Sequence, residues 1–408
     1  MLSRLVGLAA AGAVTFAAGL SLAATLTVAP GQSVQAALDK ARDGDTVQLG
    51  AGVHRGHVVV RQRIVLRGAR GAVLDGGGSG TVVRVEAPGV VVEDLNIRGS
   101  GRDLGAHDAG VYVAKSATAS VLRRLTIHAL GFGVWIHENE RSQLLDSHIT
   151  GSLEGNRPDR GNGIQLFDGD RLLVRGNTVI GGRDGVYVDA TDDSTIEHNR
   201  FEQTRYAVHT MYSHRNVLRG NHAKGNLSGI AMMFSRNTTA TGNWSEDNTE
   251  SGFFMRDVED CVVTGNHSLR NGIGLFFYGA TSNTLEKNVF AHNATGMKVW
   301  GGSVRNRVRG NAFVGNGIPV FFVATQDLVL SGNYWSDYFG WDQDGDGFGD
   351  RPYRVDSFTT RLVHRFPSAG LLLRSPAIEL LSHLEQRMPL LRVATVVDDA
   401  PLVRAEVQ

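Results

Sequence analysis

A ladder of asparagines constrains this chain more than any other feature of its sequence. Asparagine recurs at steps of 22 or 23 residues, at Asn177, Asn199, Asn221, Asn243, Asn266, Asn288, Asn311 and Asn333. A second series runs five residues behind, at Asn226, Asn248, Asn271, Asn293 and Asn316. A pair of helices needs roughly 33 residues or more, so this period fits a rung of short strands and turns. Stacked rungs let each amide bond to its copies above and below. The sequence therefore predicts an all-β chain, a parallel β-helix.

The hydrophobic pattern within each rung predicts which side chains face inward. Two columns that lie two residues apart are uniformly apolar, as at Val186 and Val188. Side chains alternate along a strand, so both columns face the interior. The intervening positions face outward, yet they carry aromatic, Met and His residues. Such a face indicates a partner surface or cover by another segment of this chain. We interpret it as a partner surface at Trp135, His137, Phe167, Tyr187, Phe254, Phe276, Tyr278 and Trp300.

Features outside the repeat divide the chain into five parts. Residues 1–23 combine Arg4, an apolar run and small residues before position 24, which is typical of a secretory signal peptide. An uncleaved membrane anchor is the alternative. Residues 24–60 would form an N-terminal cap, with a short helix at 33–41 that covers the open edge of the first rung. The β-helix would span 61–335, followed by an Asp/Gly-rich cap at 336–374. A C-terminal helix, opened by Ser375 and Pro376, and a tail would occupy 375–408.

Two rungs carry insertions that leave the same turn. Most rungs have eight residues between the Asn column and the next inward strand, whereas Leu95 to Gly110 spans 15 and Ser147 to Gly163 spans 16. We expect the two loops to project side by side. Insertions on one side of a solenoid usually belong to its binding face, but a turn that merely tolerates extra length explains them equally well.

The charge balance and the cysteine count exclude some classes of function. Lys plus Arg equals Asp plus Glu, with 41 residues each, so no nucleic acid or other polyanion is indicated as a partner. Cys261 is the only cysteine, so no disulfide can form within the chain. Its place in the repeat is that of a small turn residue.

The densest polar motif lies at residues 341–350. Carboxylates at alternate positions with glycines between them can surround a hard cation such as Ca²⁺. The side-chain ligands would be Asp342, Asp344, Asp346 and Asp350. Tyr353 occupies the twelfth position, where an EF-hand has Glu, so this is not an EF-hand loop. Tight Asp-Gly turns also form without metal, and both interpretations remain open.

A second candidate site contains softer donors. Met211 and Met233 share an outward column, and His209 lies two residues before Met211 on the same side. Thioether and imidazole groups suit Cu(I), and stacked rungs would bring them within reach of one ion. The alternative is that both methionines belong to a contact patch.

Acidic residues between 168 and 193 raise a third hypothesis. A polysaccharide-cleaving site needs clustered acids with a base or nucleophile. The candidates are Asp168, Asp170, Asp184, Asp189, Asp192 and Asp193. No acid pair recurs on neighbouring rungs, and carboxylates are ordinary turn residues. A carbohydrate-binding or carbohydrate-active protein of the lyase, hydrolase or epimerase type remains the alternative function.

The end of the repeat resembles a known family. The run Gly332-Asn333-Tyr334-Trp335-Ser336-Asp337-Tyr338, followed by the Asp-Gly stretch and Asp350-Arg351-Pro352-Tyr353, is similar to the signature of the NosD family of nitrous oxide reductase maturation proteins. The signal, the rung pattern and the terminal Ser-Pro-Ala-Ile-Glu-Leu-Leu run agree with it. The resemblance implies a right-handed parallel β-helix that is exported to the periplasm and is not an enzyme.

The same resemblance implies partners. NosD-like proteins are held at the membrane by an ABC transporter of permease and ATPase subunits, and they act with a copper-chaperone lipoprotein to supply nitrous oxide reductase. The family signature designates none of His209, Met211 or Met233 as a ligand. Their expected role in copper transfer or docking therefore depends on residue type and position alone.

Overall fold

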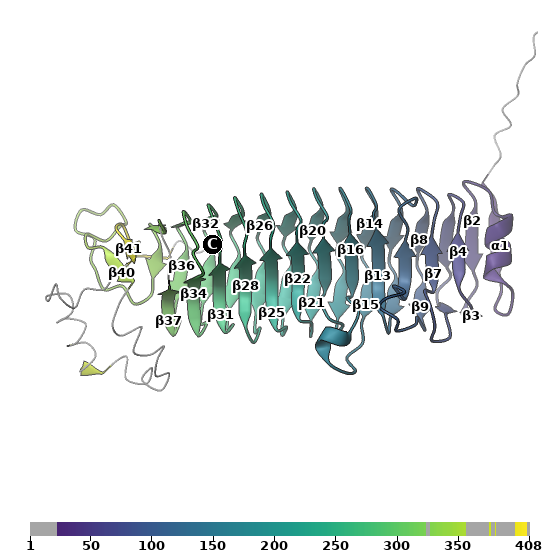
Figure 1. Ribbon diagram of the computed structural model, residues 1–408, viewed down its shortest axis with the longest axis horizontal. Coiled ribbons are helices and arrows are strands. Elements are labelled where there is room, and N and C mark those ends of the chain that lie inside the picture. Colours follow the sequence, from purple (N-terminus) through teal and green to yellow (C-terminus); the bar gives the residue numbers. More distant parts are fainter. Residues whose placement is uncertain (1–22, 324–326, 356–374, 377–379, 381–395, 406–408) are drawn as a thin grey trace, which may run out of the picture.

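The computed structural model describes residues 23–323, 327–355, 375–376, 380 and 396–405. Within these ranges the strands stack into a parallel β-solenoid of about 14 turns (Figure 1). The fold class expected from the asparagine ladder is therefore confirmed. The expected signal peptide and nearly all of the expected C-terminal helix lie outside the described residues.

The strands form three long sheets, here called A, B and C. Each turn of the solenoid adds one strand to each sheet, in the chain order C, A, B. All neighbouring strands are parallel except the last pair of sheet A, β40 and β41, which is antiparallel.

Among the described residues, sheet A has 16 strands: β1 (Thr25–Val28), β2 (Thr46–Leu49), β5 (Val65–Gly68), β8 (Val91–Glu93), β11 (Val121–Arg123), β14 (Gln143–Leu145), β17 (Leu173–Arg175), β20 (Thr195–Glu197), β23 (Val217–Arg219), β26 (Thr239–Thr241), β29 (Val262–Thr264), β32 (Thr284–Glu286), β35 (Arg307–Arg309), β38 (Val329–Ser331), β41 (Val396–Asp398) and β40 (Tyr353–Val355). Sheet B, in the same part of the chain, has 13: β3 (Gly52–Arg55), β6 (Ala72–Asp75), β9 (Asn96–Arg98), β12 (Thr126–His128), β15 (His148–Thr150), β18 (Thr178–Ile180), β21 (Arg200–Glu202), β24 (His222–Lys224), β27 (Trp244–Glu246), β30 (His267–Leu269), β33 (Val289–Ala291), β36 (Ala312–Val314) and β39 (Tyr334–Trp335).

Sheet C carries the outward columns of interest and has 12 strands within the described ranges: β4 (Val58–Val60), β7 (Val83–Val85), β10 (Ala109–Val113), β13 (Phe132–His137), β16 (Ile164–Phe167), β19 (Val186–Asp189), β22 (Tyr206–Met211), β25 (Ser228–Met233), β28 (Ser251–Arg256), β31 (Ile273–Tyr278), β34 (Thr295–Trp300) and β37 (Ile318–Phe322). Its strands pair in the register that the repeat predicts, for example Val186 with Val208 and Val208 with Ile230. These inward side chains have no exposed surface.

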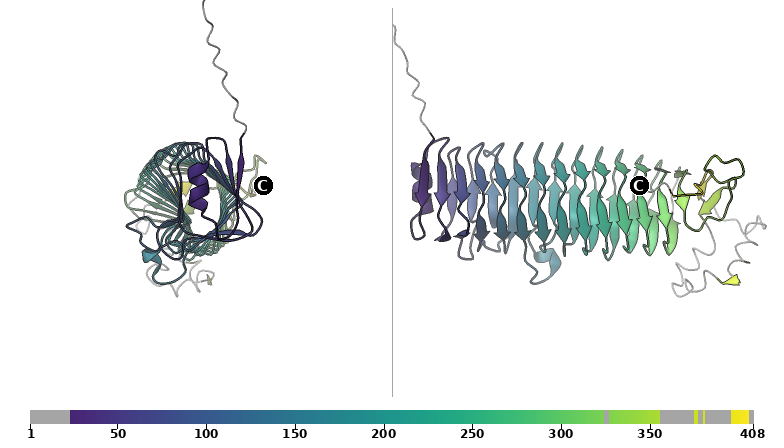
Figure 2. Two further views of the ribbon diagram at one scale, coloured as in Figure 1. Left: turned by 90° about the vertical axis from the view of Figure 1, so that its right-hand side faces the viewer. Right: turned by 180° about the vertical axis from the view of Figure 1, so that it is seen from behind.

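A short helix closes the N-terminal end of the solenoid. Helix α1 (Val34–Lys40) begins after Ser33, whose hydroxyl accepts a hydrogen bond from the Ala36 N–H at 3.2 Å. Its buried residues, Val34 and Leu38, face the first rungs. The helix lies across the open end of the coil (Figure 2, left), where the sequence places a cap, and it covers apolar surface that no preceding rung would bury.

The asparagine ladder lies in the turn between sheets A and B and is buried throughout. The side-chain amide of Asn221 shows the pattern, because its Nδ2 donates to Asn243 Oδ1 at 3.0 Å and to the Ile196 carbonyl at 2.8 Å. Its Oδ1 accepts from the backbone and side-chain N–H groups of Asn199 at 3.1 and 3.0 Å. Each Asn therefore satisfies turn groups of two neighbouring rungs, and buried polar groups need such partners.

The residue before each ladder Asn turns the chain with a positive φ. Glycine adopts this conformation at little steric cost, and it occupies most of these positions. They are Gly176, Gly220, Gly242, Gly265, Gly310 and Gly332, with His198 and Lys287 at two others. The recurring turn accounts for part of the chain's total of 51 glycines.

A carboxylate from the end of the chain terminates this ladder. Every amide donates toward the next rung, so the last one, Asn333, requires an acceptor. Asp398 in β41 supplies it, with Oδ2 accepting from Asn333 N and Nδ2 at 2.9 Å each and from Trp335 Nε1 at 3.1 Å. Asp398 has no exposed surface. The repeat itself did not predict this residue.

The two insertions project side by side, as expected from their shared turn. They connect β9 to β10 and β15 to β16, and the second contains the short 3-10 helix η1 (Arg157–Asp159), visible beside the solenoid in Figure 1. Arg102 Nη2 in the first loop lies 3.0 Å from Glu154 Oε2 in the second. Both side chains are largely exposed, so this ion pair orients the loops more than it stabilises the fold.

The ladder generates a prediction about stability. Replacing Asn243 by Ala removes the acceptor of Asn221 N and Nδ2 and the donor to the Leu218 carbonyl. Because these groups stay buried, we expect the free energy of unfolding in urea to fall by roughly 2–4 kcal/mol. Asn156→Ala is the control, since Asn156 is exposed and makes no capping bond. Equal effects of the two substitutions would contradict a stabilising role for the ladder.

Candidate functional site

Strand β22 places His209 and Met211 on the outer face of sheet C. The alternate residues Val208 and Thr210 point into the core and have no exposed surface. In the register of the sheet, Met211 lies beside Met233 of the next rung. The structure therefore places the three soft donors expected from the sequence on one face, with the two methionines side by side.

These donors are less accessible than their outward direction suggested. Only 5% of His209 and 7% of Met233 is exposed, whereas Met211 is half-buried. The expectation of an open Met/His surface is wrong here because aromatic neighbours cover the imidazole. The Tyr187 ring stacks on it with centroids 4.6 Å apart, and the Tyr206 ring meets it edge-on at 4.9 Å.

A buried ion pair holds the imidazole of His209. Asp184, in the turn before β19, has no exposed surface. Its carboxylate accepts from Arg205 Nε and Nη2 at 2.9 and 2.7 Å, and its Oδ2 lies 3.0 Å from His209 Nδ1. Burial alone would raise the pKa of Asp184, but hydrogen bonds from His209 and Arg205, together with their charges, lower it to about 2. The carboxylate is thus ionised at neutral pH.

The ion pair fixes one proton on Nδ1 of the His209 ring. An ionised carboxylate only accepts hydrogen bonds, so His209 Nδ1 carries a proton that it donates to Asp184. In the charged ring Nε2 carries a proton as well, and only the neutral ring offers an Nε2 lone pair to a metal ion. Nε2 is buried and has no hydrogen-bond partner among the described residues. Histidines that bind a metal through one ring nitrogen usually donate the N–H of the other to a carboxylate, a backbone carbonyl or water.

The sulfurs of Met211 and Met233 are the other soft donors on this face. The Tyr187 hydroxyl donates a hydrogen bond to Met211 Sδ at 3.1 Å. Burial, with a smaller contribution from Asp189, raises the pKa of Tyr187 to about 12, so this hydroxyl keeps its proton. One imidazole nitrogen and two thioethers suit Cu(I) better than Ca²⁺ or Mg²⁺. Cys261 lies in the core away from this face, and burial raises the pKa of its thiol to about 11.

Most of the clustered acids are engaged as structural turn residues. Arg215 Nη2 lies 3.0 Å from Asp192 Oδ2 and 2.7 Å from Asp193 Oδ2, and Arg171 Nη2 lies 2.8 Å from Asp170 Oδ2. Asp189 is the exception: it faces outward beside Met211, and burial raises its pKa. Asp168, whose backbone N–H donates to the Asp189 carbonyl at 3.0 Å, is an exposed carboxylate on the neighbouring rung.

The proposed partner surface separates into two parts. At the insertions, Trp135 is only 8% exposed because His107 stacks on it at 4.0 Å. Here the alternative interpretation, cover by another segment of the chain, is the one the structure supports. His137 and Phe167 stack beside it at 5.4 Å and are half-buried. Toward the C-terminal end, the aromatic residues stay more accessible, at Phe254, Phe276, Tyr278 and Trp300.

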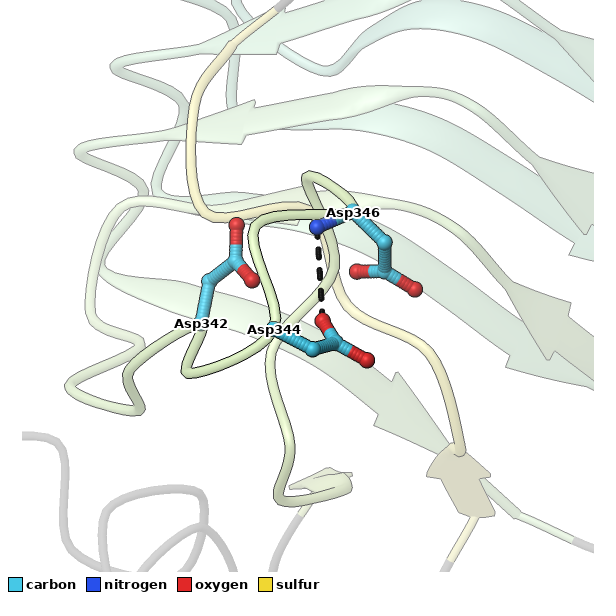
Figure 3. A group of neighbouring side chains, drawn as sticks. All are labelled: Asp342, Asp344 and Asp346. Carbon is cyan, nitrogen blue, oxygen red and sulfur yellow. Dashed lines mark hydrogen bonds between the residues drawn. The ribbon is translucent and has the colours of Figure 1, made fainter.

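The Asp-rich loop brings three of its four expected ligands together. Carboxylate oxygens of Asp342, Asp344 and Asp346 lie within 4.8 Å of one another (Figure 3). Backbone N–H groups already bond to them; for example, Gly345 N donates to Asp342 Oδ1 at 2.6 Å. Asp350 lies apart from this group, and its Oδ2 accepts from Gln343 N at 2.7 Å. Calcium binding by this loop stays a prediction.

Comparisons with known proteins agree on one family. The sequence profile of the family described as "Periplasmic copper-binding protein (NosD)" matches residues 153–340. A Pseudomonas aeruginosa PAO1 protein named "Probable ABC transporter binding protein NosD" is 40% identical over 381 residues, covering 89% of each chain. A protein of the same name from Stutzerimonas stutzeri is 34% identical over 376 residues, covering 88% of this chain and 86% of that one.

Solved structures share only the fold. The family 28 exopolygalacturonase of Yersinia enterocolitica matches with a TM-score of 0.54 at 10% identity, covering 75% of this chain and 78% of its own. The Dettilon tailspike protein matches with a TM-score of 0.51 at 16% identity, covering 70% and 63%. In the part of this chain that the structure describes, no helix is long and apolar enough to cross a membrane.

The buried ion pair predicts how stability depends on pH. The pKa of Asp184 is about 2 in the folded protein, below its ordinary value of 3.8. Its contribution to stability is therefore complete above about pH 4 and is lost as the pH falls toward 2. Asp184→Asn should lower the free energy of unfolding by about 3 kcal/mol at pH 7 and flatten its decline below pH 4, as followed by melting curves.

The matched control for Asp184→Asn is Asp193→Asn. Asp193 also pairs with an arginine, but both side chains are exposed, so its loss should change the unfolding free energy little. Equal losses of unfolding free energy in the two variants would show that the buried Asp184 ion pair stabilises the fold no more than an exposed one.

The Asp-rich loop generates a second prediction here. If it binds Ca²⁺, calcium at about 100 times Kd should stabilise the C-terminal cap by about 2.7 kcal/mol. Protection of residues 341–350 from limited proteolysis measures this effect. Asp344→Asn should remove the protection, whereas Asp327→Asn, outside the loop, should not. If cleavage of the wild-type chain did not depend on calcium, the loop would be a set of Asp-Gly turns that bind no calcium.

Proposed function

This chain belongs to the NosD family, and we propose that it is a periplasmic receptor for Cu(I) that passes the ion onward during maturation of nitrous oxide reductase. One observation carries the copper assignment. His209 Nε2 is buried without a hydrogen-bond partner among the described residues, on the outer face of sheet C that also carries Met211 and Met233. The family description as a copper-binding protein supports this assignment.

The residues around the site have distinct tasks in this proposal. Asp184 and Arg205 keep the imidazole in the tautomer whose Nε2 can accept a soft cation. Tyr187 covers the ring and bonds to Met211 Sδ. Binding of Cu(I) at this sulfur exchanges that hydrogen bond for a metal–sulfur contact. Displacement of one tyrosine is thus the conformational step that loading requires.

The proposed partners follow from the family. Relatives are named ABC transporter binding proteins, which supports attachment at the membrane through a permease and ATPase complex. A copper-chaperone lipoprotein would supply the ion, and nitrous oxide reductase would receive it. Residues 1–23 would direct export of the chain to the periplasm. In this scheme the protein is a scaffold and carrier and performs no catalysis.

The alternative function is a carbohydrate-active or carbohydrate-binding protein. One observation favours it: Asp189, with a raised pKa, faces outward on the rung before His209 and near Tyr187. Glycoside hydrolysis usually needs two carboxylates, and Asp168 on the neighbouring rung is exposed, but the family description names copper binding and no carbohydrate. The soft donor set therefore supports the copper role better.

The copper proposal predicts the effect of removing the sulfurs. Met211→Leu combined with Met233→Leu should weaken Cu(I) binding at least about 10-fold, because leucine keeps the volume and removes the ligand atoms. Competition with the chelator bathocuproine disulfonate measures the affinity. Met232→Leu is the matched control, since Met232 lies in the same strand but faces the core. In cells, the double variant should lower the copper content of nitrous oxide reductase.

Two results would contradict this proposal. Cu(I) affinity equal to that of the wild type in the double variant would remove the methionines from the site. Turnover or binding in a polysaccharide panel that is abolished by Asp189→Ala would favour the carbohydrate alternative.

A further inference from the structure

We propose that the outer face of β28, β31 and β34 is the docking surface for a copper-carrying protein, and that this partner presents a carboxylate surrounded by apolar side chains. The inference rests on the proposed copper function and adds the surface through which the ion arrives. The docking surface consists of Phe254, Phe276, Tyr278, Lys298 and Trp300.

The aromatic side chains form one continuous layer. The rings of Phe254 and Phe276 stack with centroids 5.1 Å apart, and Tyr278 meets Phe276 edge-on at 6.3 Å. Tyr278 and Trp300 remain 40% and 38% exposed. Tyrosine and tryptophan are enriched among the residues that dominate binding energy at protein interfaces. An accessible apolar layer on a solvent-exposed surface is typical of an interaction site.

A lysine without an acidic partner lies in this layer, whereas the neighbouring Arg256 pairs with Asp257 at 3.4 Å. Lys298 Nζ is 4.8 Å from the ring centre of Phe276, 4.7 Å from that of Trp300 and 6.0 Å from that of Phe321. Burial lowers its pKa, and no carboxylate of the described residues pairs with it. Two other lysines are paired: Lys115, after β10, lies 2.6 Å from Glu138, and Lys224 in β24 lies 3.0 Å from Glu246.

The unpaired lysine defines the chemistry of the partner. A protein that covers the aromatic layer also removes Lys298 from water, and a buried charge without a counter-ion strongly opposes binding. The rings offset part of this penalty through cation–π contacts. A carboxylate from the partner offsets the remainder. The surface thus selects an acidic group with an apolar surround and rejects a basic one.

The docking surface is continuous with the candidate copper site. In the register of sheet C, Met233 is followed by Arg256, Tyr278 and Trp300 on successive rungs. Three rungs at about 4.8 Å each separate Met233 from Trp300 by roughly 14 Å. An interface of about 800 Å² on each partner spans that distance. Figure 1 shows β25, β28, β31 and β34 consecutively along one face, so a docked carrier would reach the methionines.

The first test compares two sources of copper. The probes are the soluble domain of the copper-chaperone lipoprotein loaded with Cu(I), and Cu(I) in bathocuproine disulfonate. Lys298→Glu in the full chain should slow transfer from the protein at least 10-fold, whereas Lys298→Arg should retain it within about 3-fold. Loading from the small molecule should be unchanged in both, with melting curves confirming the fold. Unchanged protein transfer in Lys298→Glu would overturn the docking surface and leave the copper site intact.

The second test identifies the occupant. A photo-activated cross-linking amino acid at position 300 should capture the loaded chaperone domain, whereas the same group at position 262 should not, although Val262 is similarly exposed on sheet A. Changing the captured carboxylate of the chaperone to Lys should restore transfer to the Lys298→Glu variant. Capture from position 300 of a second copy, of residues 356–395 of the same chain, or of nitrous oxide reductase alone would overturn the proposal.

Discussion

The fold depends on buried amides that bond to one another from rung to rung. Asn221 alone links three rungs through its side chain, and its neighbours repeat the pattern. A shift of one residue in any strand would turn its inward side chains outward and would also leave these amides without partners. Hydrophobic burial and amide bonding therefore specify the same register, which is why the columns of the solenoid stay aligned over its length.

Aligned columns allow residues from separate rungs to form one site. His209 and Met211 come from one strand, Met233 comes from the next rung, and Asp184 comes from the turn one rung earlier. None of these rungs holds the full set. The same alignment extends the outer face toward Trp300, so the proposed copper site and the proposed docking surface are neighbouring stretches of one sheet. The spacing of the rungs in sheet C thus sets the distance between these two stretches.

The period of the sequence predicted the rungs, the inward columns and the meeting of Met211 with Met233, because stacking alone determines them. It did not predict the cover over His209, since a column assignment gives the direction of a side chain and not its neighbours' rotamers. The Asp184–Arg205 pair was missed although a signal existed: opposite charges lie 21 residues apart, nearly one period. Asp350 falls outside the acidic group because the turns between its loop neighbours direct it to Gln343 N.

The ladder ends at two residues, Asn333 and Asp398, that are far apart in the chain. A ribosome delivers Asn333 well before Asp398, the carboxylate that receives its amide hydrogen. Until β41 joins sheet A, the last rung of the ladder has donors without their acceptor. Asp398 therefore completes the ladder, and a chain without β41 would leave Asn333 N and Nδ2 without this acceptor at an open sheet end.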